Sequence, residues 1–543
     1  MAVKVIYKDI APDAKEDIKS IETSEVNENL SNVELLRNDE VITTPYATLE
    51  KDLWRLDGTY KAYTNDNITY IGTQVSADEA IDGKYMFNTP IVITRTFNNK
   101  HTSVGVSIQF DSPDYCNYLN IKWYNDDVMV YSNDYYPDSV EYYCKQNVEV
   151  FNKIEITFYS MNKPNRLLKI WNIFDGLNRV FKDKDLISVG VLEEMSLISE
   201  DIPINTLDIQ LVKQEDTDLI FQKKQPLLTY RDNEFIGMFF IDSGERTSKN
   251  IYEVSAVDYK GILENNTFYG GIYFDELAGN IINSIFADEN IVLNIDDDTF
   301  NTKLSGYLKI STKREALMQV LFACCSVCNT SRVNTFDIFK LRNGLVEVPA
   351  ERIKEGGKVV TESKITSVKI SVHKYTKDKE AKDVFSGELI AGDNLIQFSN
   401  PIDITANVSV SGGTLKELHN NYCIVSVTEP AEVIVNAYEY VDNVTTKEMI
   451  DPDILLGKVT EVREITDATL VSNSNYEAVL QNVYNYYINN THLESDMRIE
   501  DEQVGDRVTL HTDWSGDQTG RIEQLDYDIR KSKIGKVVQR INV

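Results

Sequence analysis

The chain has 543 residues, with 86 acidic against 55 basic side chains and a formal charge of −31 at pH 7. Contacts to phosphate need clustered Lys and Arg, so this balance argues against a nucleic acid as partner. The length far exceeds one apolar core and predicts about three to five modules. Tyr (30) and Phe (20) are plentiful while Gly (25) and Pro (12) are few, which favours ordered β structure over a linker-rich chain.

Export signals and disulfides are not indicated. No apolar run approaches the roughly 20 residues of a membrane-spanning helix, and residues 1–12 lack the apolar core of a signal peptide. We therefore expect no membrane span and synthesis in the cytoplasm without Sec export. The six cysteines are too sparse for a disulfide scaffold, so we expect reduced thiols.

Residues 1–40 mix charge with Ser and Asn without a sustained period, and we interpret them as an N-terminal arm. From about residue 41 short alternating runs follow one another, separated by turn clusters such as Asn125-Asp126-Asp127. This spacing predicts an antiparallel β-sandwich of about eight strands, carbohydrate-binding-like, over residues 41–178.

The rest of the chain predicts a multidomain, mainly β fold that carries an α/β insert. Thr206 to Leu211 alternates as a strand, whereas Ala316, Leu317, Val320 and Leu321 follow helical spacing behind a cap at residues 311–315. The predicted domains after the sandwich are a first β-barrel module (179–265), the α/β insert (266–355), a β module (356–457), and a closing helix with a second β-barrel module (458–543).

Three motifs in this C-terminal part resemble phage tail-hub and tail-associated proteins. One strand, Gly237 to Asp242, and its partner, Ile251 to Asp258, resemble the family's strand pair, whose Asp leads into a short helix. Lys313 to Leu317 resembles the helix of the family's insert, and Val504 to Val508, with Gly520-Arg521-Ile522, resembles its closing barrel. The resemblance spans roughly residues 180 to 543.

The N-terminal block is similar to tail proteins of phages, prophages and tail-like bacteriocins of Gram-positive hosts, in which a β-sandwich precedes the hub modules. Tyr46 to Glu50, Trp54 to Gly58 and Ser103 to Asp111 carry this similarity. The resemblance implies a trimeric hub or a baseplate ring in a virion tail or phage-like particle, made in the bacterial host. It implies contacts with tube, distal tail, spike or baseplate proteins and a homo-oligomer.

No enzyme motif is present in the sequence. It lacks the G-x-S-x-G elbow, the H-E-x-x-H zinc helix, the Walker loop and the G-x-G-x-x-G turn, and its five histidines are scattered through different modules. We expect no catalytic residue, no cofactor and no metal site. Cys324 and Cys328 continue the apolar face of a helix, which favours core packing over a metal. Asp296 to Asp298 and Asp513 to Asp517 lack the pattern of a calcium loop.

An aromatic cluster in the predicted sandwich is the one candidate binding surface. Planar rings there can stack on sugar rings, anchor a subunit contact or form core and cross-strand pairs, and we favour the last. The candidates for a glycan or subunit contact are Tyr115, Tyr118, Trp123, Tyr124, Tyr135 and Tyr136, with Tyr142 and Tyr143 in the same cluster.

The resulting expectation is a non-enzymatic structural protein of a tail tip or baseplate, acting as hub or hub-associated assembly protein. Two alternatives stay open. The first is a host-surface protein that binds a cell-wall glycan through residues 41–178. The second, less favoured, is a tail-associated cell-wall hydrolase.

Overall fold

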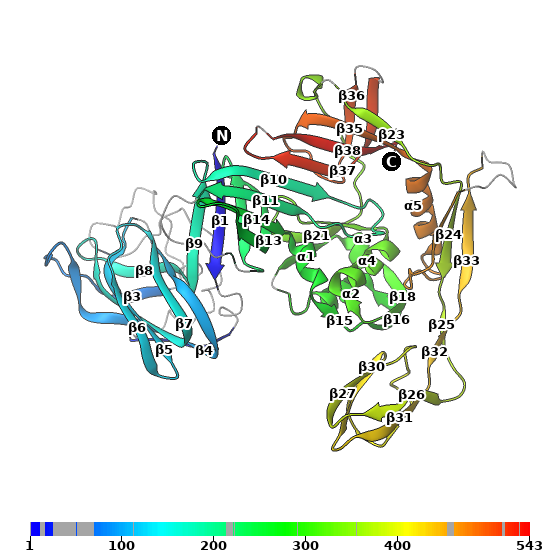
Figure 1. Ribbon diagram of the computed structural model, residues 1–543, viewed down its shortest axis with the longest axis horizontal. Coiled ribbons are helices and arrows are strands. Elements are labelled where there is room, and N and C mark those ends of the chain that lie inside the picture. Colours follow the sequence, from blue (N-terminus) through cyan, green and yellow to red (C-terminus); the bar gives the residue numbers. More distant parts are fainter. Residues whose placement is uncertain are drawn as a thin grey trace. The chain divides into compact units, whose positions relative to one another are not determined.

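The computed structural model describes residues 2–10, 17–24, 50, 70–111, 113–212, 221, 223–289, 291–354, 356–452, 461–512, 516–531 and 533–542 (Figure 1). Strands dominate, and helices gather in one insert, so the expected mainly β fold with an α/β insert is confirmed. The chain forms two compact units. We call Lys4–Phe181 with Asp218–Leu228 the sandwich unit, and Met1–Val3, Lys182–Thr217 and Thr229–Val543 the C-terminal unit.

The sandwich unit contains an antiparallel sheet in the order β3-β8-β4-β7-β5-β6, and β2 also pairs with β4. Its side chains alternate, so that Leu119 and Ile121 face Phe158 and Ile156 inside one apolar core. The strands are β2 (Ile18–Thr23), β3 (Tyr70–Val75), β4 (Tyr85–Phe110), β5 (Cys116–Asn125), β6 (Val128–Tyr135), β7 (Glu141–Met161) and β8 (Leu167–Phe174).

The segment expected to be an arm contains two strands. β1 (Val3–Ile10) buries Val3, Val5 and Tyr7 in alternation, and Ile18 and Ile21 of β2 pack against the core of the sandwich unit. The arm interpretation is therefore wrong for these strands, because β1 alternates over only a few residues and the irregular spacing of Ile18 and Ile21 in β2 gives no period-two signal. Residues 25–40 lie outside the described part of the chain. β9 (Gly176–Lys182) and β12 (Pro226–Arg231) complete the strands near the boundaries of the two units.

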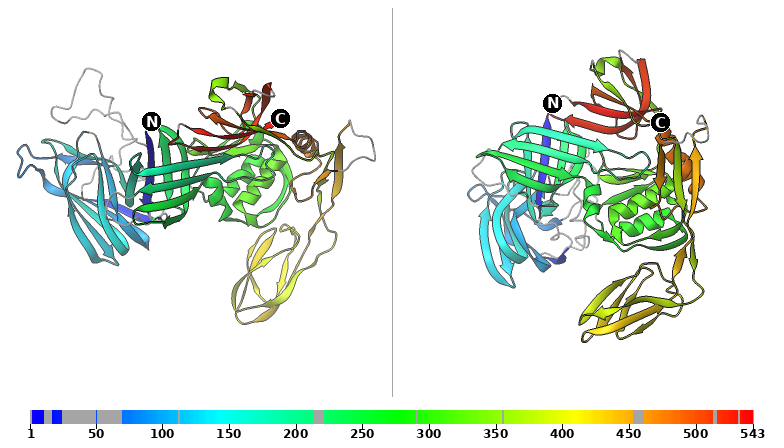
Figure 2. Two further views of the ribbon diagram at one scale, coloured as in Figure 1. Left: turned by 45° about the horizontal axis from the view of Figure 1, so that its top comes forward. Right: turned by 45° about the vertical axis from the view of Figure 1, so that its right-hand side comes forward.

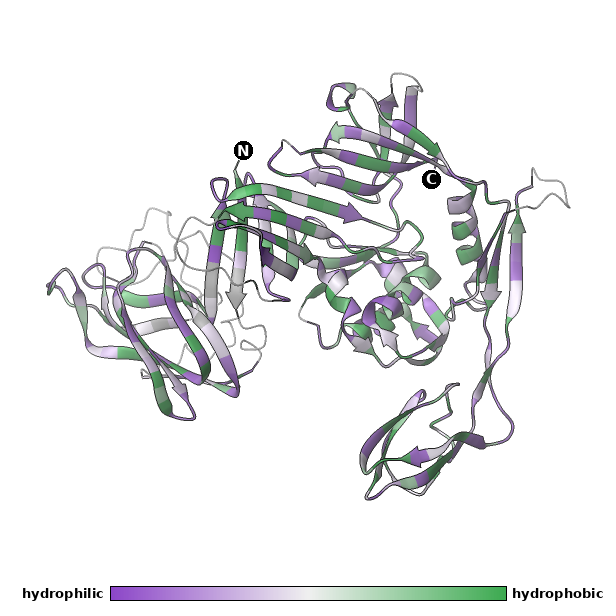
Figure 3. Ribbon diagram, viewed as in Figure 1, coloured by the Kyte–Doolittle hydropathy of each residue, from purple (hydrophilic) through white to green (hydrophobic). Residues whose placement is uncertain are grey.

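A large sheet organises the C-terminal unit, with strands in the order β23-β35-β38-β37-β10-β11-β14-β13; β36 also pairs with β37, and β22 pairs with β36. Val191 pairs with Tyr527, so the two predicted barrel modules share this sheet. Figure 3 shows the alternation of hydrophobic and hydrophilic residues along its strands. They are β10 (Leu186–Glu194), β11 (Thr206–Val212), β13 (Glu234–Arg246), β14 (Ile251–Val257), β22 (Leu345–Glu347), β23 (Lys358–Thr361), β35 (Thr491–Arg498), β36 (Arg507–Thr512), β37 (Gly516–Asp528) and β38 (Ile534–Ile541).

The helices of the α/β insert pack around one apolar core. The ribbon of the insert is green in Figures 1 and 2. Thr312 caps the longest of its helices by accepting a hydrogen bond from the Glu315 amide at 3.1 Å, and Cys325 ends it in the left-handed region, which confirms the expected cap. The helices are α1 (Tyr259–Glu264), α2 (Ala278–Ile285), α3 (Asp297–Phe300) and α4 (Lys313–Cys324). The strands are β15 (Thr267–Phe268), β16 (Gly271–Leu277), β17 (Val292–Ile295), β18 (Lys303–Leu308), β19 (Ser311–Thr312), β20 (Val327–Asn329) and β21 (Thr335–Phe339).

A small β module follows, with two three-stranded sheets around its own core. It is joined to the rest by the two-stranded sheet β25-β32 and the sheet β33-β24-β34, against which α5 packs. The elements are the 3-10 helix η4 (Ala350–Arg352), β24 (Ser367–Val372), β25 (Tyr375–Lys377), β26 (Lys382–Leu389), β27 (Gly392–Gln397), β28 (Ser409–Ser411), β29 (Thr414–Leu418), β30 (Tyr422–Val427), β31 (Ala431–Ala437), β32 (Tyr440–Asp442), β33 (Thr445–Ile450), β34 (Val462–Ile465) and α5 (Tyr476–Ile488).

Candidate functional site

A buried polar cluster joins the large sheet to the insert, at the Asp of the tail-hub-like strand pair. Asp258 caps α1 by accepting from the Lys260 amide at 3.1 Å, and its other oxygen accepts from the Thr330 hydroxyl at 2.6 Å. The Lys260 ammonium lies 3.3 Å from Asp258 and donates to the Asn205 side chain at 3.1 Å. Asn205 in turn donates to Thr330 at 3.4 Å, so the hydrogen bonds close a ring. We call these four residues the Asp258 ring.

A second buried contact joins β37, in the closing segment of the chain, to β10. The Tyr527 hydroxyl donates to Glu193 at 2.9 Å, and the Arg332 guanidinium lies 3.4 Å from the same carboxylate. Because β10 carries Glu193 and β37 carries Tyr527, the ends of the C-terminal unit meet through paired backbones and this ionic contact. Buried charges of this kind are tolerated only when paired, and here Arg332 and the Tyr527 hydroxyl together satisfy the Glu193 carboxylate.

Two of the six aromatic candidates on the sandwich unit are core residues. Trp123 is completely buried, so it is not available to a ligand or subunit, and its place among the contact candidates is corrected by the structure. The alternation of β5 decides this, since Trp123 shares the inward face of Leu119 and Ile121. Tyr135 is 7% exposed, and its hydroxyl donates to the Lys145 carbonyl at 3.1 Å.

Tyr118 and Tyr136 lie on the opposite, outward face, where they form a stack. The Tyr118 ring lies parallel to Tyr136 at 5.3 Å and to Tyr159 at 4.6 Å. The Lys84 ammonium sits 4.6 Å from the Tyr118 ring centre and 4.7 Å from that of Tyr136. The rings therefore cover much of one another's faces, as the favoured cross-strand interpretation requires.

Tyr115 and Tyr124 are separate from this stack. Tyr115 packs against the core of the sandwich unit, and the Lys153 ammonium lies 4.9 Å from the Tyr124 ring. The sequence predicted one cluster of six aromatic residues. In the structure two of them lie in the core, two lie in the outward stack, and Tyr115 and Tyr124 lie apart from both. A glycan or subunit contact by the exposed members stays a prediction.

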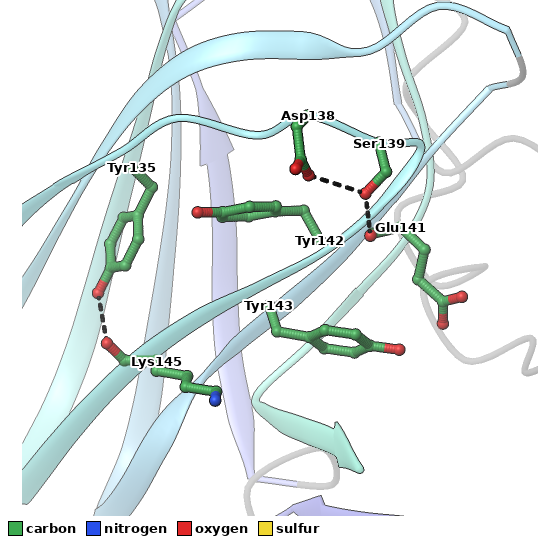
Figure 4. Close-up of a pocket in the computed structure, with 7 residues that line it drawn as sticks. All are labelled: Tyr135, Asp138, Ser139, Glu141, Tyr142, Tyr143 and Lys145. Carbon is green, nitrogen blue, oxygen red and sulfur yellow. Dashed lines mark hydrogen bonds between the residues drawn. The ribbon is translucent and has the colours of Figure 1, made fainter. Parts of the chain in front are cut away.

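A pocket of about 490 Å3 lies between the end of β6 and the start of β7 (Figure 4). Tyr135, Tyr142 and Tyr143 contribute rings to it, and Asp138 and Glu141 contribute carboxylates. Burial, together with the nearby thiol of Cys144 and the Asp138 carboxylate, raises the pKa of Tyr142, so its phenol stays protonated at neutral pH. The pKa of Tyr143 is also raised, first by burial and then by Glu141.

Sequence reasoning found the tyrosines of this pocket but missed its polar residues, Asp138, Ser139, Glu141 and Lys145. The signal that could have found them is their position in the short connection between two aromatic strand ends, where side chains converge. We call the seven residues lining it the tyrosine pocket: Tyr135, Asp138, Ser139, Glu141, Tyr142, Tyr143 and Lys145.

The other chemical candidates have structural roles. Cys324 and Cys328 pack in the core of the insert, as expected, and burial raises the pKa of each thiol to about 12. Asp296 caps α3 by accepting from the Thr299 amide at 2.8 Å, while residues 513–515 lie outside the described ranges. Among the residues that the structure describes, no group of three or more His, Cys, Asp or Glu side chains could hold a metal. None of the described helices is long and apolar enough to cross a membrane.

The sequence matches no protein-family model and no curated protein. Similar solved structures include the 43 kDa tail protein of prophage MuSo2 from Shewanella oneidensis, with 8% identity, a TM-score of 0.41, and coverage of 66% of this chain and 94% of that one. A tail protein from Neisseria meningitidis MC58 has 10% identity and a TM-score of 0.41, covering 67% and 93%. The prophage tail protein gp18 from Listeria monocytogenes EGD-e has 9% identity and a TM-score of 0.40, covering 68% and 92%. Values of this size are too low to assign a function, which has to come from the chain's own residues.

Proposed function

We propose that this chain is a structural component of the tail tip or baseplate of a phage or phage-like particle, acting as a hub or hub-associated assembly protein. The observation that carries the proposal is the convergence of the three tail-hub-like motifs in the C-terminal unit. The strands at 237–242 and 251–258 pair through Ile241 and Ala256, and the following Asp258 caps α1. The third motif forms the β36-β37 pair, where Arg507 faces Arg521.

The second motif supports the same order. Lys313 and Arg314 begin α4, and each is tied to the insert by a carboxylate: Lys313 lies 2.7 Å from Glu289, and Arg314 lies 2.6 Å from Glu264. The three motifs span more than 200 residues of the sequence but lie in one compact unit, as expected for parts of a single hub-like domain. Function as a trimer or ring, contact with tube, distal tail, spike or baseplate proteins, and a Gram-positive setting all belong to this proposal.

The test is the location of the chain in an assembled particle. Antibodies raised against the full chain should label one end of the tail in electron micrographs, and the purified chain should form a homo-oligomer or copurify with the products of neighbouring tail genes. A strictly monomeric protein that labels no tail and binds no tail component would contradict the proposal.

Binding of a host-surface glycan by residues 41–178 is a second candidate function. One observation favours it, the tyrosine pocket, which combines aromatic rings with hydrogen-bonding side chains in the sandwich unit. This function is compatible with the first, because a tail-tip protein can carry a recognition module beside its assembly modules.

A further inference from the structure

The tyrosine pocket has the size and lining of a ligand site. Its volume of about 490 Å3 falls within the range of about 300–1,000 Å3 that small-molecule pockets occupy. Tyr135 ends β6 and Tyr142 lies near the start of β7, two strands of the same sheet that are separated by β5, so both rings are held on strand backbone. Figure 4 shows Asp138 and Ser139 on one side of the Tyr142 ring and Tyr143 on the other.

Hydrogen bonds hold part of the pocket in place, although Asp138, Ser139, Glu141 and Lys145 are all exposed to solvent. The Ser139 hydroxyl contacts the Asp138 carboxylate at 3.3 Å and donates to the Glu141 carbonyl at 2.8 Å, which ties the connecting segment to the start of β7. The bond from the Tyr135 hydroxyl to the Lys145 carbonyl, at 3.1 Å, fixes that ring. The Tyr135 ring and the connecting segment are therefore preorganised, whereas a ligand would still have to order the exposed side chains of Glu141 and Lys145.

The mixture of donors and acceptors selects the class of ligand. Asp138 and Glu141 accept hydrogen bonds, whereas Lys145 and the protonated phenols donate them. An alkylammonium ion would be attracted by the two carboxylates and the ring faces, but it would leave the donors of the pocket, Lys145 and the phenols, without an acceptor. A sugar hydroxyl both donates and accepts, and the C–H face of a sugar ring stacks on an aromatic ring.

The outward stack is less suited to the same role. The Tyr118 ring is parallel to two neighbours, and a lysine ammonium lies against it, so a sugar would have to displace existing contacts. Tyr131 of β6 belongs to neither surface and is 45% exposed, which makes it a matched control on the same domain.

From these observations we propose that the tyrosine pocket binds a neutral saccharide unit of a target-cell surface glycan. Tyr142 and Tyr143 supply the stacking surface, and Asp138 and Glu141 accept from hydroxyls of the sugar. This inference rests on the second candidate function, glycan binding by the sandwich unit, and is independent of the assignment to a tail.

The experiment uses the full chain, fluorescently labelled, on an array of neutral oligosaccharides (maltotetraose, cellotetraose and N-acetylglucosamine tetramers) and neutral bacterial surface polysaccharides, with tetramethylammonium chloride as a competing cation. Saturation-transfer NMR titrations then give affinities for the oligosaccharides that bind. We expect Tyr143→Ala and Asp138→Asn each to weaken binding about tenfold, through loss of ring contact and of a charge-assisted hydrogen bond. Tyr131→Ala should leave binding unchanged. Circular dichroism and thermal melting confirm that each variant is folded, and Tyr143→Phe, which keeps the ring, should retain most of the affinity.

Each other outcome overturns a defined part of the inference. If the wild-type chain binds a saccharide and Tyr143→Ala and Asp138→Asn bind it equally well, the pocket is not the site, although glycan binding stands. If no saccharide binds, both the pocket and the second candidate function fail, whereas the tail assignment is decided by antibody labelling alone. If tetramethylammonium displaces the saccharide, or is the one probe that binds, the ligand class is wrong.

Discussion

The Asp258 ring offers the sharpest stability test of the C-terminal unit. The Asp258 and Lys260 side chains are each 2% exposed, and they lie 3.3 Å apart. The substitution Asp258→Ala removes the cap of α1, the acceptor of the Thr330 hydroxyl and the counter-charge of Lys260 at the same time. The ammonium keeps two uncharged acceptors, the Asn205 side chain and the Glu194 carbonyl.

The cost follows from these losses. A missing N-cap costs about 0.5–2 kcal/mol, and a buried charge left without its partner costs about 3–5 kcal/mol. The two effects overlap because one residue supplies both, so we expect Asp258→Ala to lower the free energy of unfolding by about 3–5 kcal/mol. The double variant Asp258→Asn with Lys260→Met, which also removes the stranded charge, should recover part of this loss.

Hydrogen exchange followed by mass spectrometry measures the effect where it occurs, in the amides of α1 and β20, while peptides from the sandwich unit serve as an internal reference. Asp296→Ala is the matched control. Within the described part of the chain, Asp296 caps α3 in the same insert but forms no ion pair, so a loss of about 1 kcal/mol is expected. Equal losses for the two variants would refute the reasoning that the buried charge dominates.

Three further outcomes are expected. Burial raises the pKa of Glu289, but its hydrogen bonds, first the one from Lys313, outweigh burial, so the net pKa lies below the ordinary value of 4.5. The insert should therefore lose stability as the pH falls below 4.5. Glu289→Gln should flatten this dependence in thermal melts from about pH 7 to about pH 3. Trp123→Ala should lower the free energy of unfolding of the sandwich unit by about 3–5 kcal/mol in denaturant unfolding, and Tyr136→Ala, which loses one exposed ring stack, by about 0.2–1 kcal/mol. Similar values for the two variants would place Trp123 outside the core. Burial raises the pKa of Cys116 to about 12, so iodoacetamide at pH 8 should label it in unfolded protein but not in the native chain, and rapid native labelling would show that the site is open.

Much of the fold could be predicted because local patterns agree with the tertiary environment. A capping pattern and apolar residues at helical spacing predicted a helix in this region, and both features are present in α4. The strands that became β11 and β14 alternate cleanly, since one face of each is buried. The predicted domain limits stay predictions, although the boundary at 178 falls close to the division between the two compact units.

The site was less predictable, because period-two alternation gives the face of a residue only once the register is known. Trp123 and Tyr124 are neighbours in the sequence, yet one is completely buried and the other faces outward beside Lys153. The tyrosine pocket depends on the same geometry, since the connection at 136–140 brings Asp138 near Tyr142.

The sequence by itself determined the acidic, multidomain and mainly β character of the chain, the caps and alternating strands, and the order of its tail-hub-like motifs. These features follow from charge, period and turn residues, which act over a few neighbours. The tertiary structure alone decided the pairing of β10 with β37, the closure of the Asp258 ring and the lining of the tyrosine pocket. Each of these three features brings together residues that are distant in the sequence, by strand register or by buried hydrogen bonds. No local sequence pattern encodes which distant residue will satisfy a given backbone or side-chain polar group.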